Sequence, residues 1–243
     1  MTAFTQACIE ANREISTQLK ENFDLSLLEK STIGAGGDIS KRADLLAEEI
    51  FVKHLGQYGT IESEESGIIG EDTPSIIIDP LDGSANFASG FPYYGTSVAR
   101  LDEEGKLSSA VVCNLINGDL FVKEGNGKPM MRHLHNDTWQ QMSDIEEPEV
   151  GIFEKAYAHP EIAAKLLEAG YKFRSPGATA LSLAYAHSVS FFLFMGHARL
   201  YDIVAGIALC EGLEVIVEED YVIVSQSITV AKDIESMIRR SKV

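Results

Sequence analysis

Apolar residues recur at helical spacing in two early segments of the chain and at strand spacing in the segments that follow. Residues 2–21 carry one apolar stripe, which predicts an amphipathic helix, and a second such helix leads from Asp44 to a stop at Gly56. Short strands are expected next, at residues 58–61, 76–78, 94–101, 107–115 and 119–123, with Asn117-Gly118 as a hairpin turn. This order predicts an antiparallel meander behind two helices.

From about residue 151 the pattern changes, and helices alternate with strands. Helices are expected at residues 160–169, 178–187, 203–211 and 232–241, and strands at 171–174, 189–194, 214–218 and 221–224. Residues 124–150 are polar, and their His133 and His135 are assigned no site. The sequence therefore predicts a chain of mixed helices and strands.

Candidate chemistry is concentrated in the stretch Ile76–Phe87. Its β-branched residues predict a short buried strand that breaks at Asp79-Pro80. Asp79, Asp82 and the Leu81 carbonyl can then point into one small volume, where hard cations such as Mg²⁺ accept oxygen ligands. A helical turn from Ser84 would leave free N–H groups for a phosphate. Taken alone, the pentapeptide Asp79–Gly83 is also compatible with a solvated turn.

Composition limits the possible partners. The 243 residues carry 20 Lys+Arg against 37 Asp+Glu, a net charge of −17, which argues against nucleic-acid binding. No apolar run is long enough to span a membrane, no secretory signal is visible, and the three cysteines have no paired spacing. We therefore expect a cytoplasmic protein without a membrane partner. Divalent cations would locally reverse the repulsion of a phosphorylated substrate.

The stretch Asp79–Phe87 resembles the metal-binding signature of the inositol monophosphatase superfamily, which also contains fructose-1,6-bisphosphatases and nucleotide 3′-phosphatases. Asp38 and Asp44 match the spacing of an acidic pair that leads into a helix ahead of that signature. The segments Arg174–Ala180 and Arg199–Gly206 resemble, in the same order, a pocket-lining segment and the second metal motif. Together these matches extend over residues 38–206.

The resemblance implies an α/β (α+β) fold, a layered α-β-α-β-α sandwich. Residues 1–145 would form an N-terminal part with the antiparallel sheet and the metal signature, and residues 146–243 a C-terminal part that completes the active site. It also implies roles for particular residues. The metal ligands would be Glu64, Asp79, Asp82, Asp202 and the Leu81 carbonyl. Catalysis would use Asp44, Glu64 and Ser84, and the substrate would meet Asp82, Gly83, Ser84, Gly177, Ala178 and Thr179.

Two of these assignments have rivals in the sequence. Glu71 mimics the motif of Glu64, but Glu64 follows a predicted strand and precedes Gly67, as the motif requires. Arg174 and Arg199 are candidates for binding a second phosphate group, and each could equally be an ordinary surface charge. The glycine-rich segment 33–37 lacks a Gly-x-Gly-x-x-Gly pattern, so it predicts a mobile loop and no nucleotide fingerprint.

The expected activity is hydrolysis of inositol monophosphate or a related sugar phosphate, with two or three Mg²⁺ ions and inhibition by Li⁺. An acid often found in superfamily members that act on inositol phosphates is replaced by Met195, so the substrate stays open. The alternatives are a fructose-1,6-bisphosphatase, a nucleotide 3′-phosphatase, or a regulatory binding protein that keeps the fold. The resemblance also implies a homodimer.

Overall fold

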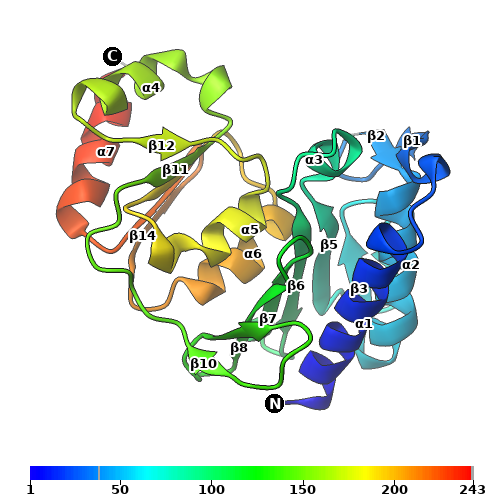
Figure 1. Ribbon diagram of the computed structural model, residues 1–243. Coiled ribbons are helices and arrows are strands. Elements are labelled where there is room, and N and C mark those ends of the chain that lie inside the picture. The colour runs from blue at the N-terminus through cyan, green and yellow to red at the C-terminus, as the bar shows by residue number, and fades with distance from the viewer. Residues whose placement is uncertain (38, 242–243) are drawn as a thin grey trace.

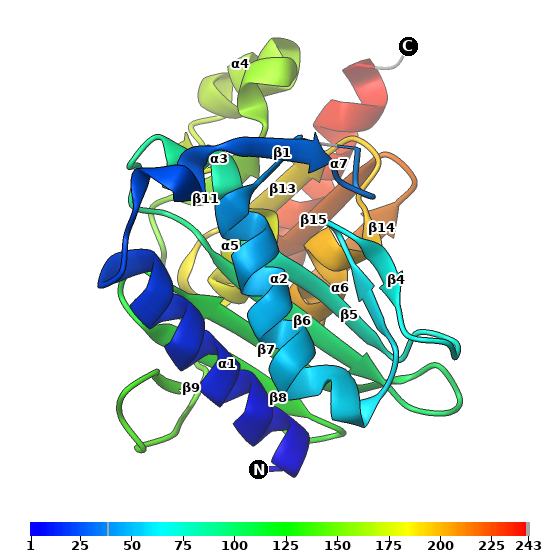
Figure 2. The same ribbon diagram turned by 90° about the vertical axis from the view of Figure 1, so that its right-hand side faces the viewer.

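The computed structural model describes residues 1–37 and 39–241, which form five layers (Figure 1). Helices α1 (Ala3–Lys20) and α2 (Arg42–Leu55) cover one face of a large sheet, as Figure 2 shows. Helices α5 (Thr179–Ala184) and α6 (Leu200–Leu209) lie between this sheet and a second one, whose outer face carries α4 (Pro160–Glu168) and α7 (Ile228–Ser241). The α-β-α-β-α sandwich is confirmed. None of the described helices is long and apolar enough to cross a membrane.

The large sheet has eight strands in the order β10-β9-β8-β7-β6-β5-β3-β4. Strands β5 to β10 form antiparallel pairs, which confirms the meander, whereas β3 pairs parallel with β5. A separate two-stranded ribbon precedes α2. The strands are β1 (Lys30–Ile33), β2 (Ile39–Lys41), β3 (Ile61–Ser63), β4 (Gly67–Ile69), β5 (Ile76–Asp82), β6 (Gly95–Leu101), β7 (Leu107–Asn114), β8 (Asp119–Glu124), β9 (Met130–His133) and β10 (Gln140–Gln141).

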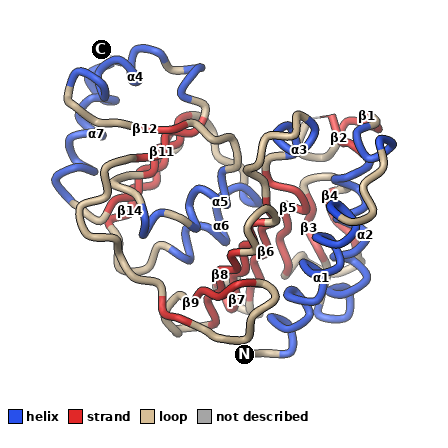
Figure 3. The backbone as a smooth tube through the Cα atoms, viewed as in Figure 1, coloured by secondary structure: helices blue, strands red, loops and turns tan. Residues whose placement is uncertain are grey.

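The second sheet has five strands in the order β12-β11-β13-β15-β14. Strand β11 pairs parallel with both of its neighbours, and the remaining pairs are antiparallel. The strands are β11 (Gly151–Glu154), β12 (Phe173–Arg174), β13 (Phe192–Met195), β14 (Glu214–Glu218) and β15 (Tyr221–Ser225). Figure 3 shows the two sheets on either side of α5 and α6. The sequence patterns did not predict six of the strands, namely β1, β2, β4, β9, β10 and β11.

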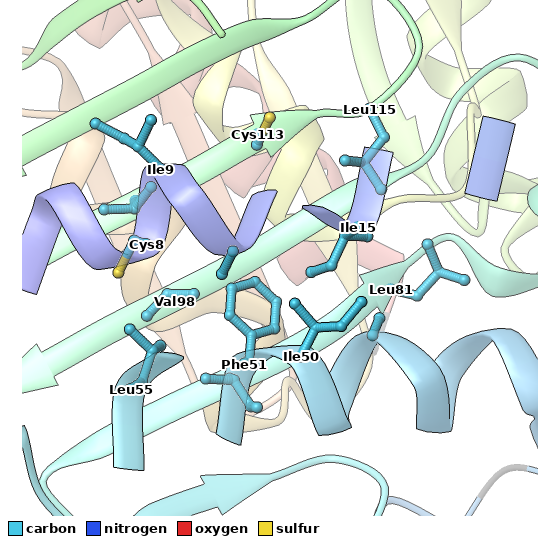
Figure 4. Close-up of a cluster of buried hydrophobic side chains, with 14 of the residues drawn as sticks. Cys8, Ile9, Ile15, Ile50, Phe51, Leu55, Leu81, Val98, Cys113 and Leu115 are labelled. Carbon is cyan, nitrogen blue, oxygen red and sulfur yellow. The ribbon is translucent and has the colours of Figure 1, made fainter. Parts of the chain in front are cut away.

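The core beneath α1 and α2 explains why their apolar stripes face the sheet. Phe51 and Val98 are fully buried there, together with Cys8 and Cys113 (Figure 4). Burial raises the pKa of both thiols. Cys210 is buried in a different cluster around the second sheet, and all three cysteines are free thiols.

Close packing of α5 against α6 fixes the middle layer. A Cβ atom at Gly206 would lie 2.5 Å from the Cβ of Leu183 and 3.2 Å from the Ala180 carbonyl oxygen. Glycine therefore lets α6 approach α5 more closely than any other residue would. Both helices also contact β5 of the large sheet.

Candidate active site

The predicted metal signature lies at the carboxyl end of β5, and the strand runs through it. Asp79 pairs with Ser97 and Asp82 pairs with Gly95, so β5 holds one more residue than β6 over this interval. The expectation that the strand breaks at Asp79-Pro80 is therefore wrong. The extra residue makes a bulge, a place where a strand tolerates proline and re-aims its side chains. Gly83 follows with a φ of +86° and begins α3 (Ser84–Ala88).

Three carboxylates from different parts of the chain meet at this point. Glu64, which follows β3, Asp79 on β5 and Asp202 on α6 each place an oxygen within 4.8 Å of the others. Glu71, the alternative to Glu64, is exposed and lies outside this group. Burial first, and then repulsion by Glu64, Asp82 and Asp202, raises the pKa of Asp79 well above its usual value.

A divalent cation fits this group of acids. Carboxylate and carbonyl oxygens are the ligands of hard cations, and a buried group of acids gains most from an added positive charge. Asp79 and Asp202 are buried and Glu64 is partly buried, and the Leu81 carbonyl belongs to the bulge that holds Asp79.

Asp82 belongs to the same site but is held by main-chain donors. Its Oδ1 accepts a hydrogen bond from Thr179 N at 2.9 Å, and its Oδ2 accepts one from Leu181 N at 2.8 Å. Burial raises the pKa of Asp82 well above normal, although the amide of Leu181 opposes the shift. The first turn of α5 is thus attached to the end of β5 by this side chain.

Asp44 lies nearby in the first turn of α2. Its Oδ2 accepts a hydrogen bond from Lys41 N at 2.6 Å, while its Oδ1 is buried and has no partner among the described residues. Burial, with a contribution from Glu65, raises the pKa of Asp44 to about 6. The hydroxyl of Ser84 accepts a hydrogen bond from Lys41 Nζ at 3.3 Å. The sequence analysis did not identify Lys41.

The start of α2 involves residues outside the predicted site. Lys41 is the N-cap residue, and Ser40 lies in β2, where its hydroxyl donates to Glu65. Asp38, the first acid of the predicted pair, lies outside the described residues. Asp44 itself occupies the first turn, as the sequence predicts.

A buried glutamate holds the loop that precedes α5. Glu154, at the end of β11, accepts hydrogen bonds from Gly177 N at 2.8 Å and Ala178 N at 3.4 Å. Burial raises its pKa. Asn86 binds the same loop from the other side, donating to the Pro176 carbonyl at 2.7 Å. Sequence reasoning missed Glu154, because only two consecutive apolar side chains, Ile152 and Phe153, precede it in β11.

These groups line one cavity of about 820 Å³. It contains all the predicted site residues except Asp44, Ala178 and Arg174. Asp44 and Ala178 are buried, whereas Arg174 lines an adjoining, mainly apolar cavity of about 640 Å³ that shares Ser175 and Pro176 with the first. Arg174 also donates a hydrogen bond to the Phe173 carbonyl at 2.9 Å and is exposed. The structure therefore does not bring Arg174 into the acidic cavity.

Several cations accompany the acids in this cavity. Arg199 contacts Asp202 and Glu64 directly, and the lysines are Lys30, Lys41 and Lys155. Burial lowers the pKa of Arg199, but the contacts with Asp202 and Glu64 more than offset this and raise it overall. A strongly acidic protein thus has a cavity of mixed charge, in which anions and cations can both be bound.

A sequence profile of the Inositol monophosphatase family matches residues 1–217, and the chain belongs to this family. Among curated proteins, 136 residues are 31% identical to the inositol-1-monophosphatase of Mesorhizobium japonicum, covering 54% of this chain and about half, 49%, of that protein. A longer match of 200 residues, 30% identical, covers 74% of this chain and 70% of the fructose-1,6-bisphosphatase/inositol-1-monophosphatase of Methanothermobacter thermautotrophicus.

Solved structures and one further relative complete the comparison. The extragenic suppressor protein suhB of Bartonella henselae superposes with a TM-score of 0.76 at 23% identity, covering 97% of this chain and 96% of that chain. The IMPase of Thermotoga maritima gives 0.76 at 21% identity, covering 96% and 97%. The Nus factor SuhB of Xylella fastidiosa is 29% identical over 76% of this chain and 69% of its own length. The structural matches establish the fold, and the family profile supports a phosphatase.

Proposed function

We propose that this chain is a Mg²⁺-dependent phosphomonoester hydrolase that acts on inositol monophosphate or a related sugar phosphate. The observation that carries the proposal is the group of Glu64, Asp79 and Asp202 at the end of β5, beside an amide-rich turn and in a cavity of about 820 Å³. Family membership supports the reaction class. Two or three Mg²⁺ ions, inhibition by Li⁺, a homodimer and a cytoplasmic location remain parts of this proposal.

In this mechanism the acids of the β5 end hold the cations. Glu64, Asp79, Asp82, Asp202 and the Leu81 carbonyl are the proposed ligands. Bound Mg²⁺ would polarise the phosphoryl group and lower the pKa of water. The N–H groups of Gly83 and Ser84 would bind phosphoryl oxygens, with the loop Gly177–Thr179 as the opposite wall of the substrate site.

Asp44 is the proposed base. Its pKa of about 6 leaves it ionised at neutral pH. A general base is most effective when its pKa lies near the working pH, so this value suits proton transfer at neutral pH. The Ser84 hydroxyl accepts from Lys41, so its own proton remains available to donate. Ser84 would therefore pass the proton of the attacking water to Asp44, while the Lys41 ammonium stabilises negative charge beside it.

A second anionic group on the substrate would find partners in the same cavity. Lys30 and Lys155 both line it, and the Lys155 ammonium also lies 5.1 Å from the centre of the Phe194 ring. This favours fructose 1,6-bisphosphate, or a nucleotide bisphosphate, as the second candidate substrate class. Arg174 has no part in this proposal.

The test is phosphate release with Mg²⁺ from inositol 1-phosphate, fructose 1,6-bisphosphate, adenosine 3′,5′-bisphosphate and NADP, each with and without Li⁺. Turnover that disappears with EDTA and in Asp79→Asn would support the proposal and identify the substrate class. No turnover on any of the four, in protein shown by calorimetry to bind Mg²⁺, would instead favour a regulatory binding protein with this fold.

A further inference from the structure

The guanidinium group of Arg199 forms ion pairs with two of the three carboxylates of the candidate metal site. It binds Asp202 through two parallel contacts, Nε to Oδ2 at 2.9 Å and Nη2 to Oδ1 at 3.1 Å. The same Nη2 lies 2.8 Å from Glu64 Oε1. Bidentate contacts of this kind are among the stronger ion pairs in proteins. Arg199 therefore acts as the counter-ion of this acid group in the metal-free protein.

The position of Arg199 is built into the fold. Arg199 is the N-cap residue of α6 and Asp202 lies in the first turn, so the helix start sets their separation. The guanidinium carbon lies 5.1 Å from the centre of the Tyr201 ring, and Nη1 donates to the Gly36 carbonyl at 3.0 Å. Three separate segments, α6, the end of β3 and the glycine-rich loop, thus hold one side chain.

The glycine-rich loop packs directly on this ion pair. Gly36 N donates to the Glu64 carbonyl at 2.8 Å. A Cβ atom at Gly36 would lie 2.8 Å from Glu64 Cγ and 3.0 Å from Arg199 Nη1. The segment that the sequence analysis expected to be a mobile loop is therefore hydrogen-bonded to the residues of the site.

A divalent cation and this guanidinium need the same oxygens. A cation held by Glu64, Asp79 and Asp202 would lie close to Arg199, and two positive charges at such separations repel each other strongly in a partly buried site. We propose that Arg199 is an internal competitor for the metal site, displaced from Glu64 and Asp202 when the divalent cation binds, so that it weakens the apparent affinity for that cation. This inference rests on the proposed function, because it assumes that the acids bind metal.

The test measures Mg²⁺ binding by isothermal titration calorimetry at fixed ionic strength. Arg199→Gln removes the competitor, and we expect it to bind Mg²⁺ about tenfold more tightly than the wild type, since coupling between two binding events typically changes an affinity by about 5- to 150-fold. The metal-free variant should also melt at a lower temperature, because its acids have lost their counter-ion, with the difference disappearing in saturating Mg²⁺.

Arg239→Gln is the matched control. Arg239, on α7, forms surface ion pairs with Glu218 on β14 and Glu235 on α7, so this variant changes the net charge by the same amount without touching the acidic cavity. It should bind Mg²⁺ as the wild type does. Equal or weaker Mg²⁺ binding by Arg199→Gln, relative to both wild type and control, would overturn the proposal.

A measurement on the wild type makes the test independent of how the variant folds. The Nε–H of Arg199 donates to Asp202, so in protein without added metal this proton should exchange slowly with water. In ¹H–¹⁵N spectra the exchange should become faster as Mg²⁺ is added. Retained protection at saturating Mg²⁺ would overturn the inference while leaving the proposed phosphatase intact. Absence of Mg²⁺ binding in wild type and Arg199→Gln alike would overturn both.

Discussion

Asp82 and Asp202 enter the same cavity from the end of β5 and the start of α6, yet their charges are compensated in different ways. Both oxygens of Asp82 accept main-chain amides of α5, whereas both oxygens of Asp202 accept nitrogens of the Arg199 side chain, with one long main-chain bond in addition, from Arg199 N to Oδ2 at 3.4 Å. Main-chain amides of a packed helix cannot leave without moving the helix, whereas a side chain can rotate away. We therefore expect Asp82 to stay bound to α5, whereas the contact between Asp202 and the Arg199 side chain can be replaced by another ligand.

The largest effects should come from Asp82→Asn and Asp202→Asn, each of which removes a charge from the proposed metal site. Both should lower the rate of phosphate release by at least about 100-fold. Replacing a residue that only supports a metal ligand already costs up to about 100-fold, and these residues are proposed as ligands themselves. They should differ in thermal unfolding without metal. Asp82→Asn should lower Tm more, because its NH₂ group would face an α5 amide. A greater loss of Tm in Asp202→Asn would break the comparison.

Asp44 is a third case, since its Oδ2 accepts one main-chain amide while its Oδ1 is buried without a partner among the described residues. Its folded pKa of about 6 lies above the usual value of 3.8, so ionisation costs folding free energy as pH rises from about 4 to 7. Asp44→Asn should remove this cost. Urea unfolding of the metal-free variant should then show a stability gain of up to about 3 kcal/mol at pH 7 that fades below pH 4.

The same variant separates a base from a metal ligand. Asp44→Asn should reduce turnover strongly at saturating Mg²⁺ while Mg²⁺ affinity by calorimetry changes little. Unchanged turnover with weakened Mg²⁺ binding would count against Asp44 as the base, and an unfolding profile with the wild-type pH dependence would count against its raised pKa.

The rigidity of the middle layer, which the comparison assumes, can be tested at Gly206. Gly206→Ala would force its new Cβ atom to within 2.5 Å of Leu183 and should destabilise the protein by about 1–3 kcal/mol in urea unfolding. Gly56→Ala is the control: Gly56 has an ordinary φ of −57° and open space around it, so alanine there should be neutral or slightly stabilising. A neutral Gly206→Ala would show that α6 adjusts its position easily.

The smallest effect is expected at Arg174. Its guanidinium is exposed and lines the other cavity, so Arg174→Ala should change kcat/KM by less than about twofold for whichever phosphate ester is turned over. A tenfold loss would mean that this side chain reaches the acidic cavity and that cations from both regions contact the substrate.

The sequence predicted the part of the site that is contiguous. Asp79, Leu81, Asp82, Gly83 and Ser84 follow one another along a strand end and a turn, so their chemistry is readable without knowing the fold. The predicted helices and most strands also appear, with α6 starting three residues earlier than expected. The alternation of apolar and polar residues was sufficient for these elements because each buries one face.

Contacts between segments far apart in the sequence could not be predicted in this way. Glu154 is a lone acid at the end of a short strand, and only its distance to Gly177 reveals what it does. Lys41 looks like an ordinary residue before a helix until Ser84 is placed beside it. For Arg199, the sequence suggested a phosphate contact, whereas the described structure pairs it with Glu64 and Asp202.

The buried cysteines give this protein built-in reporters of conformational opening. Cys8 on α1 and Cys113 on β7 lie in the core between the two N-terminal helices and the large sheet, Cys210 lies against the second sheet, and burial keeps the pKa of each thiol high. A thiol is alkylated only as its thiolate and only when exposed. Pulsed alkylation followed by peptide mass analysis would therefore time the opening of the two cores separately, without introducing any label.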